Sequence, residues 1–114
     1  MRNPALALLL AAGLAAGAAR AAAAAPVVLT LQNHRFTPAE FTVPAGQVVT
    51  IQLVNRDAAT EEFDSHDLKV EKLVTPGGRI TFTVGPLKPG AYSFMGEFHA
   101  QTAQGRVTAV AGAR

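Results

Sequence analysis

Short runs of aliphatic and β-branched residues recur along most of the chain and predict β-strands. Val49, Ile51 and Leu53 alternate with polar residues, and the same two-residue period returns over 80–84. Because successive side chains of a strand point to opposite faces, each predicted strand has one apolar and one polar face. The predicted strands are 27–31, 40–43, 48–54, 79–84, 91–94 and 106–110.

Glycine and proline mark the boundaries between these runs, at 44–46, 76–78, 86–90 and 103–105. Turns at this regular spacing predict an antiparallel β-sandwich. The segment 55–75 has no clear period. There we expect an irregular strand over 63–70, followed by a turn or a single helical turn over 71–75. The predicted fold class is therefore all-β, with a single sandwich.

The first 24 residues differ from the rest of the chain. Arg2 precedes the uncharged run 5–19, and Arg20 and an alanine tract follow it, which is typical of a secretory signal peptide. We expect a signal peptide at 1–24 and one domain at 25–114, exported to the periplasm. Ala24–Ala25 is the preferred cleavage bond, and bonds from Ala19 onward stay open. The apolar run is shorter than the roughly 20 residues of a membrane span, so the mature protein is expected outside the bilayer.

Charge and cysteine content exclude several classes of protein. Ten basic and eight acidic residues give a net charge of +2. Two of the basic residues lie in the predicted signal peptide, so the predicted mature chain has eight basic and eight acidic residues and no net charge. No basic stripe remains that could bind nucleic acid. The chain has no cysteine, which excludes disulfides and a lipid anchor on cysteine. No serine stands in a motif typical of a nucleophile with its base.

Several motifs follow one another in a specific order. FTPAEFTVPAG occupies 36–46, Asn55 ends a predicted strand, GAYSF occupies 90–94, and His99 precedes GRVT at 105–108. This order resembles the cupredoxins over nearly the whole of 25–114. The resemblance implies a small Greek-key β-sandwich with a metal at one end. A residue after the central Asn and a cluster in the last strand-to-strand loop would bind that metal.

The resemblance also assigns the family's ligand positions to residues of this chain. The first His position falls on Glu61, the Cys position on Gly96, the second His position on His99, and the Met position at or near Gln104. Blue copper depends on a copper–thiolate bond, and the chain has no thiolate. It is therefore not expected to be a blue-copper protein.

A closer similarity is to a cysteine-free periplasmic subgroup of cupredoxin-like proteins, often encoded beside ferrous-iron permeases. The matching segments are EEFDS at 61–65, EK at 71–72, PLKPG at 86–90, and GEFH at 96–99 continuing to TAQG at 102–105. This resemblance implies a role in metal handling, either copper-dependent oxidation of ferrous iron or delivery of metal to a permease.

Five residues are the candidate metal ligands: His99, Glu97, Glu61, Glu62 and Met95. Imidazole and carboxylate suit Cu(II) and iron, and the Met95 thioether suits Cu(I). Because neighbouring residues of an extended chain point oppositely, one of Glu61 and Glu62 should face the site and the other solvent. Each candidate has an alternative: an ordinary loop histidine, solvated acids, and a methionine that fills a gap in the core.

Other chemistry-bearing residues have weaker support. Asp64, His66 and Glu71 are an alternative, surface metal site, while His34 has no visible partner and is expected to be structural or exposed. The aromatic residues of the second half are expected in the core: Phe82, Tyr92, Phe94 and Phe98.

The function hypothesis is a periplasmic copper-binding protein, with iron as a second metal, acting with a membrane permease or another metal-handling partner. Whether it is an enzyme stays open, between a copper-dependent ferrous-iron oxidase and a carrier without redox turnover. The opposing hypothesis is a metal-free β-sandwich that serves as an interaction module. Paired carboxylates and histidine at the expected site favour metal binding, because a degenerate copy has no reason to keep them.

Overall fold

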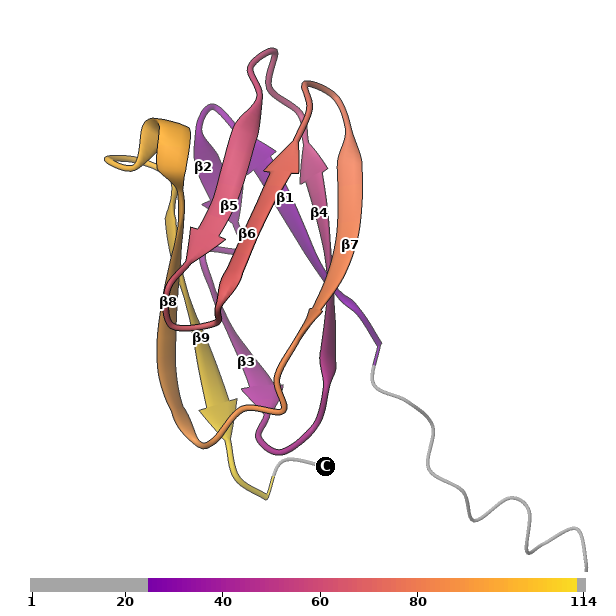
Figure 1. The fold of residues 1–114 in the computed structure, drawn as a ribbon, viewed down its shortest axis with the longest axis vertical. Helices are drawn as coiled ribbons and strands as arrows, with labels where there is room; N and C mark the ends of the chain where they lie inside the picture. Colours follow the sequence, from indigo (N-terminus) through magenta and orange to yellow (C-terminus); the bar gives the residue numbers. More distant parts are fainter. Residues whose placement is uncertain (1–24, 113–114) are drawn as a thin grey trace, which may run out of the picture.

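Nine strands form two sheets that face each other in the computed structural model, which describes residues 25–112 (Figure 1). The four-stranded sheet has the order β2 (Arg35–Thr37), β1 (Val27–Gln32), β4 (Val49–Asn55) and β7 (Arg79–Val84). The five-stranded sheet has the order β3 (Glu40–Pro44), β9 (Gln104–Val110), β8 (Gly90–Gly96), β5 (Glu61–Ser65) and β6 (Val70–Val74). The prediction of an all-β sandwich is confirmed. The predicted signal peptide at 1–24 lies outside the described residues.

Helical structure is confined, within 25–112, to the single turn η2 (Glu97–His99) between β8 and β9. No helix of the described residues has the length and apolar character that crossing a membrane requires.

The direction of two strand pairs differs from the prediction. β1 pairs with β4, and β3 with β9, in parallel, whereas the remaining pairs are antiparallel. A purely antiparallel sandwich was therefore a wrong expectation. Alternation along a strand shows which face is buried, but the direction of its neighbour depends on where the chain crosses between the sheets. Here β3 crosses to the second sheet before β4 returns to the first.

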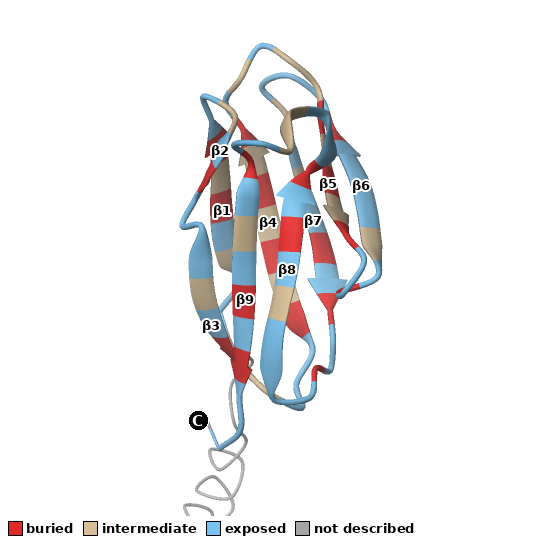
Figure 2. Cartoon of the chain, turned by 90° about the vertical axis from the view of Figure 1, so that its left-hand side faces the viewer, coloured by how far each residue is buried: buried red, intermediate tan, exposed pale blue. Residues whose placement is uncertain are grey.

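The inward faces of both sheets make one apolar core, visible as buried bands that alternate with exposed ones (Figure 2). Its centre is aromatic: the rings of Phe63 and Phe94 stack at 4.9 Å, and Phe36 and Phe82 pack against them. Phe82 and Phe94 are buried as predicted. Phe98 is not, because β8 ends at Gly96 and the following turn of η2 leaves this ring 52% exposed.

The segment without a clear period folds as a β-hairpin, β5–β6, around a turn in which Lys69 has φ 58°. The irregular strand predicted over 63–70 is a strand only at 63–65 and 70, and the turn or single helical turn predicted over 71–75 was wrong, because β6 occupies that segment. Two of the three buried positions of β5 are polar, Glu61 and Ser65, which conceals its alternation. β6 lies at the sheet edge with Val74 as its one buried residue, so its pattern is weak as well.

Four connections lie at one end of the sandwich: the β1–β2 turn, the β4–β5 loop, the β6–β7 turn, and η2 with the residues after it (Figure 1). We call this the loop end. It corresponds to the metal end that the cupredoxin resemblance implies.

Candidate metal centre

A buried carboxylate is the central feature of the loop end. Glu61, the first residue of β5, is 1% exposed. Its Oε1 accepts hydrogen bonds from the backbone N–H groups of Phe98 at 2.8 Å and Glu62 at 3.0 Å, and its Oε2 lies 2.6 Å from Nδ1 of His99. A buried carboxylate is costly unless such partners compensate for lost hydration. Glu61 is therefore a buried carboxyl group with three hydrogen-bonding partners at the point where β5 begins.

His99 is held in place by the loop that follows β8. The backbone N–H of Gly96 donates to the carbonyl of Ala103, which closes the loop, and the N–H groups of Thr102 and Ala103 both donate to the carbonyl of His99. The His99 side chain keeps 28% of its surface exposed. A hollow of about 310 Å³ opens beside it, lined by residues 98–102. The imidazole is thus fixed at its base and reachable from solvent at its ring.

Glu61 and Gly96 share one space. A Cβ atom added at Gly96 would lie 2.6 Å from Cδ and 2.7 Å from Oε2 of Glu61. Gly96 stands at the family's Cys position, so the carboxylate extends into the volume that a thiolate side chain would need. The residues present do not fit a blue-copper site, and blue-type coordination is absent from this cysteine-free chain. They do fit an ion that accepts nitrogen and oxygen donors.

A second imidazole, which the sequence did not lead us to expect here, completes the cluster. His34 stacks on His99 with ring centroids 3.6 Å apart and planes 9° from parallel. One donor atom from each of His34, Glu61 and His99 lies within 4.8 Å of the others. A signal existed in the sequence, because Asn33 and His34 separate two strands and such a two-residue turn points to the end of a sandwich. It went unnoticed because the three-residue strand β2 was not predicted.

The β4–β5 loop connects this cluster to the core. Asn55 is fully buried, and its amide nitrogen donates to the carbonyls of Ala59, Val74 and Thr75. Its Oδ1 accepts from the backbone N–H of Asp57. The central Asn of the resemblance therefore has a structural role: it shapes the loop that leads to Glu61.

The other predicted ligands lie outside this cluster. Glu62 and Glu97 form a separate group with Glu71 on the outer face of the five-stranded sheet. Met95 is 40% exposed on the same face, opposite its cross-strand partner Asp64. A hydrogen bond with Asp64 and the charge of Glu62 raise the pKa of Glu97. Of the pair at 61–62, Glu61 is the residue that faces His99.

The residues of the alternative surface site line one hollow of about 390 Å³ at the β5–β6 hairpin, but within residues 25–112 they do not form a metal-type cluster. Asp64 and Glu71 are cross-strand partners, while His66 lies in the β5–β6 turn and belongs to neither metal-type cluster of the described residues. Gln104, at the family's Met position, donates its side-chain amide to the carbonyl of Ala100 and is exposed.

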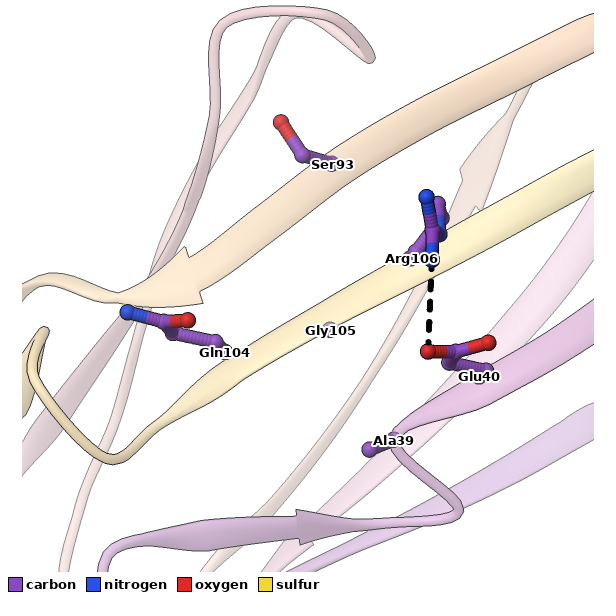
Figure 3. A pocket seen from close by; sticks show the side chains of 6 residues that line it. All are labelled: Ala39, Glu40, Ser93, Gln104, Gly105 and Arg106. Atoms are coloured by element: carbon purple, nitrogen blue, oxygen red, sulfur yellow. Dashed lines mark hydrogen bonds and ion pairs between the residues drawn. The ribbon is translucent and has the colours of Figure 1, made fainter.

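A further hollow of about 350 Å³ lies on the outer face of β3, β8 and β9 (Figure 3). Its polar side chains include Glu40 and Arg106, joined by an ion pair at 3.4 Å. Both side chains are exposed, and such surface pairs contribute little. The hollow contains none of the candidate ligands.

Comparison with known proteins agrees with this picture. The family model of the cupredoxin-like domain matches residues 5–109. The uncharacterized protein RP394 of Rickettsia prowazekii (strain Madrid E) is 43% identical over 79 residues, which are 69% of this chain and 63% of that protein's length.

Solved structures share the fold at low sequence identity. Reduced auracyanin from Roseiflexus castenholzii superposes with a TM-score of 0.64 at 20% identity, over 78% of this chain and 99% of its own. Auracyanin A from Chloroflexus aurantiacus, a "blue" copper protein, superposes with a TM-score of 0.65 at 16% identity, over 75% of this chain and 98% of its own. A purple cupredoxin from Nitrosopumilus maritimus superposes with a TM-score of 0.57 at 19% identity, over 74% of this chain and 99% of its own. With a family model that spans nearly its whole length, this chain belongs to the family of cupredoxin-like domains.

Proposed function

We propose that this protein is an exported copper-binding protein that acts in iron or copper handling. The observation that carries the proposal is the Glu61–His99 pair at the loop end, a buried carboxylate bonded at 2.6 Å to an imidazole that solvent can reach. The carboxylate occupies the volume beside Gly96, the residue to which the cupredoxin resemblance assigns the family's Cys position. A carboxylate from β5 would then supply the negative charge that a thiolate at position 96 would supply in a blue-copper site.

The alternative of a metal-free interaction module accounts less well for this pair. Replacing a whole buried pair by apolar residues is often neutral or stabilising, so stability alone does not require the Glu61–His99 pair. Glu61 nevertheless has three hydrogen-bonding partners at this position. Imidazole and carboxylate together suit Cu(II), and also iron. Copper held by them would supply a one-electron redox couple.

The surface beside the loop end supports a role in cation handling. Glu62, Asp64, Glu71 and Glu97 gather on the outer face of β5, β6 and η2. A surface of one sign raises the local concentration of oppositely charged ions. This charge would favour the approach of metal cations, whether the protein oxidises ferrous iron, carries copper, or delivers metal to a permease.

A Cu(II) titration against a competing chelator tests the proposal. His99→Ala should weaken binding at least about tenfold, equivalent to ~1.4 kcal/mol. Glu61→Gln should also weaken it, because the anionic charge is lost at nearly constant volume. His66→Ala is the matched control and should bind like the parent protein. Equal affinity of His99→Ala and the parent, or a loss in His66→Ala alone, would move the site away from the loop end and overturn the proposal.

A second measurement separates the roles. Ferric iron should form faster from ferrous iron in air with the copper-loaded protein than with the copper-free protein if it is an oxidase. Equal rates of ferrous-iron oxidation with the two forms would exclude the oxidase role and favour the carrier role.

A further inference from the structure

We propose that His34, which lies outside the ligand positions of the cupredoxin resemblance, is the second imidazole ligand of the metal centre at the loop end. This inference rests on the proposed function, because it names a donor of the same site. The two imidazole donors would be His34 of the β1–β2 turn and His99 of the η2 loop, with the Glu61 carboxylate at the start of β5 beside them.

The position of His34 is imposed by contacts distant in sequence. Asn33 and His34 have φ values of 54° and 57°, in the left-handed region that residues other than glycine adopt at a cost. Asp57 stabilises this turn: its Oδ1 accepts the N–H of Asn33 at 2.7 Å, and its Oδ2 accepts the N–H of His34 at 2.9 Å. Asn55 in turn holds Asp57 in place, because its side-chain Oδ1 accepts a hydrogen bond from the backbone N–H of Asp57. The buried core thus determines where the His34 ring lies.

Both rings are oriented in the same manner by a carboxylate. Nδ1 of His99 lies 2.6 Å from Glu61 Oε2, and Nδ1 of His34 lies 3.4 Å from Asp57 Oδ2. In metal sites, a carboxylate at one ring nitrogen sets the tautomer and leaves the other nitrogen as the ligand. Within residues 25–112, Nε2 of neither ring takes part in a hydrogen bond. Each imidazole therefore has one oriented nitrogen and one that is available.

The spacing of the rings suits a shared ion. Two nitrogen ligands about 2.0 Å from a tetrahedral ion lie roughly 3.3 Å apart. One donor atom of each of His34, Glu61 and His99 lies within 4.8 Å of the others, and because the stacked ring planes are only 9° from parallel, both rings would turn out of the stack to direct a nitrogen at one ion. The side chains of His34 and His99 are 42% and 28% exposed, so an ion can approach them from solvent. The neighbouring Glu61 adds negative charge.

The test counts imidazoles and measures affinity in the same samples. The purified protein is loaded with Cu(II), and pulsed electron paramagnetic resonance reports the number of coordinated imidazoles; a competing chelator gives the affinity. The parent should show two imidazoles. His34→Gly should show one and bind at least about tenfold more weakly. Glycine accepts a positive φ freely, so this variant should remain folded. His34→Asn is a second variant, because asparagine also tolerates that region. His66→Ala is the control.

The outcomes separate this inference from the proposed function. If His99→Ala loses affinity while His34→Gly and His34→Asn bind like the parent with the same imidazole count, His34 is not a ligand and only the inference falls. If none of these variants changes affinity, the loop end is not the copper site and both proposals fall. Loss of one imidazole in each of the His34 and His99 variants, with cooperative thermal melts, establishes the two-histidine site.

Discussion

Replacing Gly96 by alanine should destabilise this protein strongly, although alanine normally tolerates the local backbone. Gly96 has φ −92° and ψ 108°, an ordinary extended conformation in which alanine is usually more stable than glycine. The obstacle is steric. A Cβ atom at this position would lie 2.6 Å from Cδ of Glu61 and 2.8 Å from Cβ of Ala103. These distances are far inside van der Waals contact, so a buried neighbour must move.

The size of the effect follows from what must move. Overpacking a well-filled core costs about 1–3 kcal/mol. If Glu61 shifts instead, its bonds to Phe98 and His99 weaken, and hydrogen bonds to charged groups contribute about 1.5–3 kcal/mol each. We expect a loss of about 3 kcal/mol in the free energy of unfolding. With a denaturant slope of about 1–1.5 kcal/mol/M for a small domain, the urea midpoint should fall by about 2 M or more.

Urea unfolding of a double-mutant cycle tests the cause. In a Glu61→Ala background the carboxylate is gone, so Gly96→Ala should cost at least about 1 kcal/mol less than in the parent. Gly46→Ala is the control, because its φ of 80° gives backbone strain while its added Cβ meets nothing within 4 Å. A Gly96→Ala protein as stable as the parent, or equal costs in both backgrounds, would refute the shared-space argument.

Three further predictions concern stability and colour. Asn55→Ala should lower the free energy of unfolding by about 2–4 kcal/mol in urea melts, since it removes hydrogen bonds to the carbonyls of Ala59, Val74 and Thr75. The backbone N–H and hydroxyl of Ser93 lower the pKa of Asp67 below its ordinary 3.8, so this carboxylate stabilises the fold above that pH. Asp67→Asn should therefore melt lower than the parent at pH 7, and the gap should close as the pH falls below about 4. The copper-loaded protein should lack the intense blue absorption in visible spectra, and finding that band would contradict the ligand assignment.

Local patterns predicted the parts of the fold that rest on one strand at a time. Alternation in 49–53 and 80–84 reports burial of one face, which the core confirms at Ile51 and Phe82. The β5–β6 hairpin could not be predicted in the same way. Its buried positions include Glu61 and Ser65, whose burial depends on partners at Phe98, His99 and Ser93 far along the chain.

The same distinction applies to the candidate centre. His99 and Glu61 were both named from aligned motifs, and the fold brings them into contact. His34 carried no partner in the sequence, because its neighbour His99 reaches it only when the two sheets close at the loop end. Glu97 was expected beside His99, and Glu62 was the alternative to Glu61. Because η2 begins after Gly96 and β5 alternates, Glu97 and Glu62 lie with Glu71 on the outer face.

The amino-acid sequence by itself determined the chemistry available to this protein: no thiolate, one small all-β core, and imidazole and carboxylate as the donors. Those properties depend on composition and on the two-residue period of strands, which are local. Tertiary structure alone decided that Glu61 enters the space beside Gly96 and that His34 lies against His99. Such proximity is a property of packed sheets and closed loops, because it depends on contacts between residues that only the folded chain brings together.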